Sequence, residues 1–239
     1  MRIADNIEIV KLALYFKSTL IISDVHIGYE EALNKQGILV PRQQFEEIIR
    51  QIEEVFGILK HKKIERIIIN GDLKHEFGTI SEQEWRNTLK FIDLLFKHCN
   101  EIILIKGNHD NILGPIAKKR NIKVVEYVLK NKVLITHGNK IPDKSILKNV
   151  STIIIGHEHP AVSLKEGPRV EHFKCFLKGK YKGKNLIVQP SFNTLLEGTD
   201  ILRDKILSPF LKQKLDNFKI FIVEDRVYEF GKLRALKGI

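Results

Sequence analysis

Short apolar segments rich in isoleucine alternate with helical patterns through the first half of the chain, and this alternation restricts the folds open to it. Residues 19–22, 64–70 and 102–106 are apolar and β-branched, as strands are. Apolar side chains recur between them at helical spacing, at Phe45, Ile48, Ile49, Ile52, Val55 and Phe56. Ser81 and Glu84 form a capping pair for a second helix. The pattern predicts an α/β fold with a sheet-rich core and helices outside.

The rest of the chain favours strands. Residues 7–16 and 122–129 each read as one strand, and residues 111–120 read as a short helix. Further strand patterns occupy residues 132–136, 152–155, 170–177, 185–189 and 219–223. No repeat, low-complexity tract or linker interrupts the chain, so residues 1–239 are predicted to form a single domain.

Composition narrows the class of protein. No stretch reaches the roughly 18 apolar residues of a membrane span, and the N-terminal residues lack the pattern of a signal peptide, so we expect a cytoplasmic protein without membrane contact. Cys99 and Cys175 belong to no Cys-x-x-Cys unit and are expected to be buried thiols. The net charge of +11 fits a nucleic-acid partner, and it fits a lysine-rich, thermally adapted surface equally well.

Five small clusters of metal-ligating residue types each follow an apolar strand. They are Asp24 with His26; Asp72 after Gly71; Asn108, His109 and Asp110 after Gly107; His137; and His157 with His159 after Gly156. Taken singly, Asp-x-His is usually structural, Gly-Asp is first a turn signal, and His137 could be a core histidine, whereas Gly-His-x-His is the most suggestive cluster. Ligands of open α/β sheets collect at the carboxyl ends of strands, so the five clusters are expected to converge.

Spacing and residue type both favour a metal site. Residues two apart on an extended segment point the same way, so Asp24 with His26, and His157 with His159, can each present two ligands. Imidazole, carboxylate and amide oxygen without thiolate suit manganese, iron, zinc, nickel or cobalt. The ligand set does not select one of these metals.

The order of these clusters resembles the signature of the calcineurin-like metallophosphoesterases. The resemblance implies a four-layer αββα sandwich with a dinuclear metal site at strand C-terminal ends. It implies that one metal is held by Asp24, His26 and His159, and the other by Asn108, His137 and His157, with Asp72 bridging both. The implied cofactors are two divalent ions, with Mn²⁺ as our first expectation and Fe, Zn, Ni or Co as alternatives.

The same resemblance implies a mechanism. A metal-bridging hydroxide would attack phosphorus in line, and the two cations would neutralise charge on the phosphoryl oxygens. His109 would stabilise or protonate the leaving oxygen, and Asp110 would orient the His109 imidazole. All seven implied ligands and His109 are present, which argues against an inactive binding protein on the same fold.

The run from Gly71 to Gly78 departs from many relatives. It is similar to a prokaryotic subgroup that includes ligase-associated DNA-damage-response endonucleases and phosphoesterases related to double-strand-break repair nucleases. Within it, Lys74 and His75 are candidates for contacts with substrate phosphate, although His75 could equally be an ordinary loop histidine. Lys180 and Lys182 flank Tyr181 in a second basic run, where lysines and an aromatic ring can follow a nucleic-acid backbone. Solvated lysines at a hairpin tip are the competing interpretation.

The leading hypothesis is therefore a phosphodiesterase that acts on nucleic acid as an endonuclease does. A phosphoesterase for a nucleotide or another small phosphorylated metabolite is the alternative. The sequence leaves open the native metal, the diester or monoester preference, endo- or exonuclease action, and a homodimer through the strand-rich C-terminal third.

Overall fold

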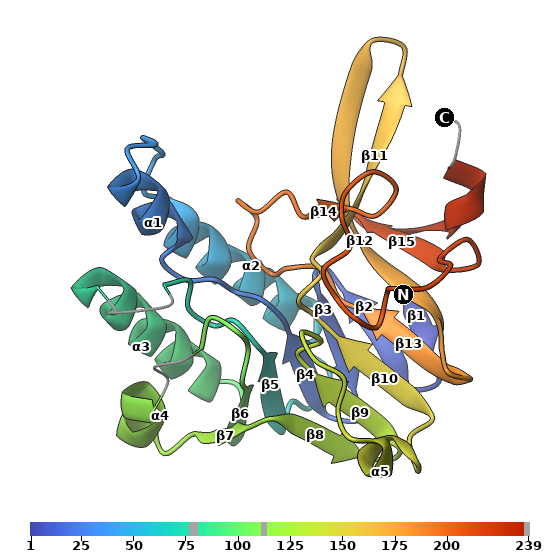
Figure 1. Ribbon diagram of the computed structural model, residues 1–239. Helices are drawn as coiled ribbons and strands as arrows, with labels where there is room; N and C mark the ends of the chain where they lie inside the picture. Colours follow the sequence, from blue (N-terminus) through green and yellow to red (C-terminus); the bar gives the residue numbers. More distant parts are fainter. Residues whose placement is uncertain (77–80, 111–113, 237–239) are drawn as a thin grey trace.

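Two β-sheets stacked face to face form the centre of the computed structural model, which describes residues 1–76, 81–110 and 114–236 (Figure 1). The first sheet is seven-stranded, and its strands lie in chain order. These strands are β1 (Arg2–Ala4), β2 (Ile7–Val10), β3 (Ala13–Phe16), β4 (Thr19–Ile22), β5 (Arg66–Asn70), β6 (Glu101–Ile105) and β7 (Lys123–Val125). Strands β4 to β7 run parallel to one another, so their carboxyl ends share one edge.

The second sheet is nine-stranded and has the order β14-β11-β12-β13-β10-β9-β8, with β15 paired to β12 and β16. Its strands are β8 (Tyr127–Lys130), β9 (Val133–Thr136), β10 (Thr152–Ile155), β11 (Pro160–Glu166), β12 (Arg169–Tyr181), β13 (Lys184–Val188), β14 (Thr199–Asp200), β15 (Lys219–Val223) and β16 (Val227–Lys232). Strands β9, β10 and β13 are parallel, and a long β11–β12 hairpin projects from the body (Figure 1).

Helices cover the outer face of the first sheet, and the outer face of the second is covered mostly by irregular chain (Figure 1). The helices are α1 (Tyr29–Lys35), α2 (Gln44–Ile58), α3 (Glu82–Phe96), α4 (Gly114–Arg120) and α5 (Lys144–Leu147), with a 3₁₀ turn η1 (Leu233–Leu236). The fold is thus the expected layered α/β sandwich, although its fourth layer holds little helix. No helix in the described ranges is long and apolar enough to cross a membrane.

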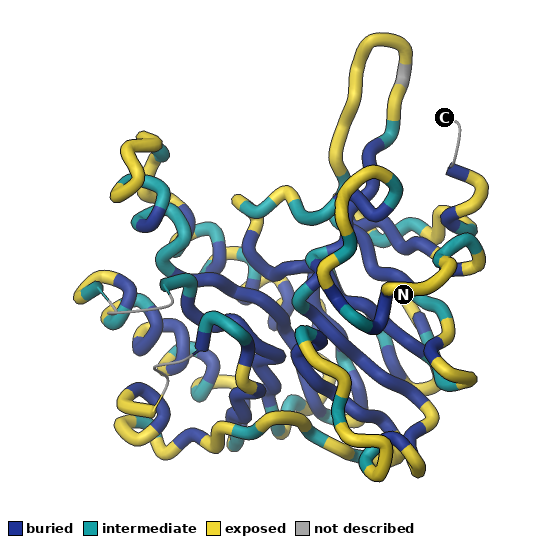
Figure 2. Tube along the Cα trace, viewed as in Figure 1, coloured by how far each residue is buried: buried dark blue, intermediate teal, exposed yellow. Residues whose placement is uncertain are grey.

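The central strands of both sheets are buried (Figure 2), and the alternation of their side chains divides the apolar core into two clusters. In β10, Ile154 joins the cluster between the sheets, whereas Ile153 and Ile155 pack against the outer cover of the second sheet. Because both faces of these parallel strands are buried, they are continuously apolar rather than alternating with polar residues. These continuous apolar runs are why the parallel strands could be predicted from the sequence.

Several predicted elements differ in their boundaries. Residues 7–16 form a hairpin, because Lys11 adopts a left-handed backbone (φ 52°) that turns the chain between β2 and β3. Residues 122–129, predicted as one strand, form two: β7 belongs to the first sheet and β8 to the second. The helix predicted over residues 111–120 is seen from Gly114, and residues 77–80 and 111–113 lie outside the described part. The predicted cap is confirmed, since Ser81 Oγ accepts the backbone N–H of Glu84 at 3.1 Å.

Candidate metal centre

The loops that follow β4, β5, β6, β9 and β10 meet between the two sheets and bring the predicted ligands together. The first group is Asp24, His26 and His159, whose candidate ligand atoms all lie within 4.8 Å of one another. Asp24 Oδ1 is 3.3 Å from His159 Nε2, and the Nε2 atoms of His26 and His159 are 3.4 Å apart. One ion could therefore be reached by all three side chains.

The second group is Asp72, His137 and His157, again with ligand atoms within 4.8 Å. Asn108 joins it, because its Oδ1 lies 3.0 Å from His137 Nε2. Asp72 Oδ2 is 3.4 Å from His137 Nε2 and 3.8 Å from His26 Nε2, which belongs to the first group. Asp72 thus lies between the two groups, at the position of a bridging carboxylate.

Backbone strain is concentrated at these positions. The residues with left-handed φ angles include Asp24 (55°), His26 (47°), Asp72 (44°), His157 (65°) and His159 (49°). Non-glycine residues avoid this region, and they remain there only where surrounding structure holds them. Each of the five follows the end of a strand by two or four residues. The strained backbone of these loops thus directs the candidate ligands toward one place.

Two glycines leave the space that these side chains occupy. A Cβ on Gly71, whose φ is 85°, would collide with the His137 imidazole, and a Cβ on Gly156 would collide with Ser23 Oγ and Asp24 Oδ2. A side chain at either position would displace a candidate ligand. The glycine-first form of these clusters therefore reflects close packing around the site.

The electrostatics fit a cation. Asp24 is fully buried; its Oδ2 accepts from Ser23 Oγ at 2.6 Å and from the His157 backbone N–H at 3.0 Å. Its Oδ1 has no hydrogen-bond donor among the described residues and faces His159 and His137 instead. Although burial opposes it, the charge of His159 keeps the pKa of Asp24 below its ordinary value. A buried, ionised oxygen without a donor is a suitable metal ligand, and the neighbouring imidazoles supply further ones.

The pKa values of the histidines in the site differ with their surroundings. Burial lowers the pKa of His157 to about 4 and that of His26 well below its ordinary value, which keeps both neutral as metal ligands must be. Burial also acts on His137, but the hydrogen bond to Asp72 and the charges of Asp24 and Asp72 outweigh it and raise its pKa to about 9. The two carboxylates thus attract positive charge to the centre of the site.

His109 lies at the mouth of the site. Its Nε2 is 4.0 Å from Asp72 Oδ2, and its backbone N–H donates to Asp72 Oδ1 at 2.8 Å. Its Nδ1 lies 2.5 Å from the carbonyl oxygen of His75, which fixes the ring with Nε2 toward the site. The resemblance implied an orienting role for Asp110, and the contact with the carbonyl of His75 was not predicted.

Asp110 braces two loops in the structure. Its carboxylate oxygens accept the backbone N–H groups of Leu73, at 3.2 Å, and Gly107, at 3.0 Å. Burial raises the pKa of this carboxyl to about 7. Asp110 therefore ties the loop after β5 to the loop after β6, which carry Asp72 and Asn108.

The two candidate substrate contacts on the loop after β5, Lys74 and His75, have different surroundings in the structure. Lys74 is fully buried, and its Nζ donates to the carbonyl oxygens of Glu76 and His109, so it links loops instead of facing a substrate. His75 stands beside the site, with Nδ1 3.3 Å from His26 Nδ1 and its ring centroid 5.2 Å from that of His109. Burial lowers the pKa of His75 to about 4, so its imidazole is neutral.

Lys180 and Lys182 are not brought to the metal centre. They lie at the β12–β13 turn, beside the start of β10, whereas His157 follows the end of β10. At about 3.3 Å per strand residue, the two positions are roughly 15–20 Å apart along the sheet.

Several supporting residues were missed by the sequence argument. Ser191 Oγ donates to the carbonyl oxygen of Asp24 at 2.7 Å, and the buried Lys174 amine donates to the carbonyls of Ser191 and Asn193. Glu84 of α3, treated above only as a capping residue, accepts the backbone N–H groups of His75 and Glu76 at 3.0 and 3.1 Å. These hydrogen bonds join side chains to backbone groups of other segments, and no local sequence pattern predicts them.

Glu84→Ala is expected to loosen the loop that carries His75 and to slow turnover. It leaves two partly buried N–H groups unpaired, at about 1–3 kcal/mol each, so the melting temperature should fall and kcat should drop while bound metal is retained. Glu84→Gln, which keeps an acceptor oxygen, should preserve most activity. Equal kcat in Glu84→Ala and in the exposed control Glu82→Ala would contradict this positioning role.

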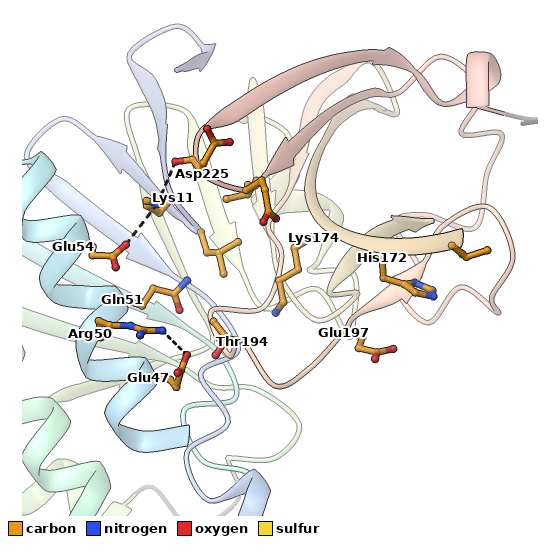
Figure 3. A pocket seen from close by; sticks show the side chains of 14 residues that line it. Lys11, Glu47, Arg50, Gln51, Glu54, His172, Lys174, Thr194, Glu197 and Asp225 are labelled. Carbon is orange, nitrogen blue, oxygen red and sulfur yellow. Dashed lines mark hydrogen bonds and ion pairs between the residues drawn. The ribbon is translucent and has the colours of Figure 1, made fainter. Parts of the chain in front are cut away.

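A groove of about 780 Å³ lies between α2, β12 and residues 194–197 (Figure 3), and its lining includes Lys174. Two ion pairs lie in its lining, since Lys11 contacts Glu54 at 3.6 Å and Arg50 contacts Glu47 at 2.9 Å. The seven candidate ligands are not part of its lining. It is therefore a groove of mixed charge that holds none of the candidate ligands.

Comparisons with known proteins identify the family of this chain and solved structures that are similar to it. A family model described as calcineurin-like phosphoesterase matches residues 17–174. The solved structure of nuclease MPE from Pseudomonas putida superposes with a TM-score of 0.63 at 20% identity, covering 91% of each chain. Vps29 from Entamoeba histolytica, solved with zinc, gives a TM-score of 0.38 at 15% identity, covering 88% of this chain and 95% of its own. Among curated proteins, none matches the sequence.

Proposed function

This chain belongs to the calcineurin-like phosphoesterase family, whose members hydrolyse phosphoesters, and from that premise we propose that it is a two-metal phosphodiesterase acting on nucleic acid as an endonuclease does. The observation that carries the two-metal part is the pair of ligand groups that share Asp72. The nucleic-acid part is supported by the net charge of +11 and by the fold shared with a nuclease.

The residues fit two divalent ions. Asp24, His26 and His159 would hold one, Asn108, His137 and His157 the other, and Asp72 both. When bound, such ions supply an activated water and neutralise charge on the phosphoryl oxygens. Manganese is the metal we propose, with iron, zinc, nickel or cobalt compatible with the same ligands.

The protein's own groups supply orientation and proton transfer. His109 Nε2 lies at the mouth beside Asp72, where it can donate a proton or a hydrogen bond to the oxygen that leaves phosphorus. The carbonyl of His75 holds the His109 ring in that orientation. The neutral imidazole of His75 lies next to it and is our candidate for contact with the substrate phosphate.

The test compares bis-p-nitrophenyl phosphate, a diester, with p-nitrophenyl phosphate, a monoester, in the presence of Mn²⁺. We expect hydrolysis mainly of the diester, followed by cleavage of DNA or RNA whose binding weakens steeply as salt increases. Hydrolysis confined to the monoester, or saturable turnover of mononucleotides that is insensitive to salt, would favour a small-molecule phosphatase instead.

A further inference from the structure

Four lysines surround a pocket at the edge of the second sheet that lies opposite the metal centre. The pocket has a volume of about 450 Å³; Lys144, Lys148, Lys182 and Lys184 surround it, and Leu147 and Tyr181 form its apolar floor. We call it the lysine pocket. Its lining includes Lys182, which is a basic residue beside an aromatic ring in the sequence. Lys182 has no place in the metal centre.

Local structure explains why the lysines converge. Lys182 (φ 47°) and Gly183 (φ 80°) form the left-handed turn between β12 and β13, which places Lys184 opposite Tyr181. The short helix α5 precedes β10 and brings Lys144 and Lys148 to the same edge. The parallel strands β10 and β13 then run from this edge toward the metal centre.

The charge of the pocket is one-sided. Among the described residues, no carboxylate lines it. Lys184 donates to the carbonyl oxygen of Val150 at 2.8 Å, and Lys182 Nζ lies 5.3 Å from the centre of the Tyr181 ring. The groove beside α2 differs, because carboxylates, among them Glu47 and Glu54, line it together with its cations. A net positive pocket with an apolar floor suits a ligand that is anionic and carries a flat apolar group.

We infer that the lysine pocket binds a nucleotide segment of a single-stranded nucleic acid, with phosphates on the lysines and a base against the apolar floor. Lysines that follow a backbone beside apolar surfaces for bases are the common design for single strands. The inference rests on the proposed nucleic-acid substrate and goes beyond it, because the site is remote from the scissile phosphate.

A single strand fits better than a duplex. The bases of a duplex are stacked inside, and a duplex is stiff over about 150 base pairs, so it would not bend around one sheet from the metal centre to the opposite edge. A flexible strand can pass over the surface and reach both places. The lysine pocket would then add affinity without taking part in hydrolysis.

The test removes three of the lysines as Lys144→Gln, Lys148→Gln and Lys182→Gln, and keeps Lys184 because it bonds Val150. Metal-free protein is titrated with a labelled single strand of about 20 nucleotides, longer than the roughly 4–16 that one surface covers. At about 0.7 released ions per phosphate contact, the slope of log affinity against log salt should decrease by about 2, so the loss of affinity relative to wild type should be roughly 15–20-fold greater at about 50 mM than at about 200 mM salt. Hydrolysis of bis-p-nitrophenyl phosphate should be unchanged.

A matched triple variant removes the same charge elsewhere, with Lys118→Gln, Lys119→Gln and Lys123→Gln on α4 and β7. Equal losses in both triple variants would show that net charge alone binds the strand, and would overturn the pocket. Unchanged binding in the first variant would overturn it as well. If wild-type protein binds anionic vesicles but no oligonucleotide, the pocket assignment fails together with the nucleic-acid substrate, while diester hydrolysis would still support the phosphoesterase.

Discussion

Asp72→Asn is expected to weaken both metal ions together and to reduce diester hydrolysis more than any other single substitution in the site. The Asp72 carboxylate lies 3.4 Å from His137 and 3.8 Å from His26, which belong to the two different ligand groups. Asparagine keeps the shape and one oxygen but removes the charge that would be shared. Since residues that only support ligands change metal affinity by about 10–100-fold, loss of this shared ligand should cost at least that much for each ion.

Metal content after dialysis, measured beside the rate on bis-p-nitrophenyl phosphate, checks this expectation. The control is Asp225→Asn, which makes the same change in the exposed turn between β15 and β16 and should behave as wild type. Loss of one ion with normal retention of the other would show that Asp72 serves a single ion.

His109→Ala is expected to retain both metals and to lose most turnover. The ring is half-buried at the mouth of the site, outside both ligand groups that contain Asp24 and Asp72, so its removal leaves those groups intact. General-acid assistance contributes about 10²–10⁴-fold, and kcat on the diester should fall within that range. The decrease in kcat should be greater for a substrate with a poor leaving group than for a substrate whose leaving group is p-nitrophenolate.

The control is His61→Ala, an exposed histidine on the loop after α2, which should leave kcat unchanged. If His109→Ala lost a metal ion along with activity, the imidazole would be a ligand and its role as a proton donor would be wrong. The group of His26, His75 and His109, whose ligand atoms also lie within 4.8 Å, makes this outcome worth measuring.

The candidate ligands were predictable because two constraints act together on them. Metal chemistry fixes the residue type, and parallel strands of one sheet bring their carboxyl ends to one edge, so Asp24, Asp72 and Asn108, which follow β4, β5 and β6, could be placed together from the sequence. The buried parallel strands were equally visible, because burial on both faces makes them continuously apolar.

The supporting contacts were not predictable for a different reason. Glu84 and Lys74 form hydrogen bonds with backbone groups of other loops. Which backbone group each side chain bonds depends on tertiary packing, which no local sequence pattern encodes. The backbone turn at Lys11 was missed because a lysine gives no sign of a left-handed conformation. The backbone contacts of Asp110 were not predictable either, since the N–H groups of Leu73 and Gly107 give no signal in the sequence.

The most direct test of the central claim is a titration of metal-depleted protein with Mn²⁺, in which bound ions and hydrolysis of bis-p-nitrophenyl phosphate are measured in the same samples. The two ligand groups around Asp72 predict that binding reaches two ions per chain and that activity develops as the second ion binds. Full activity with one ion per chain, or hydrolysis that persists without a divalent ion, would contradict the two-metal account.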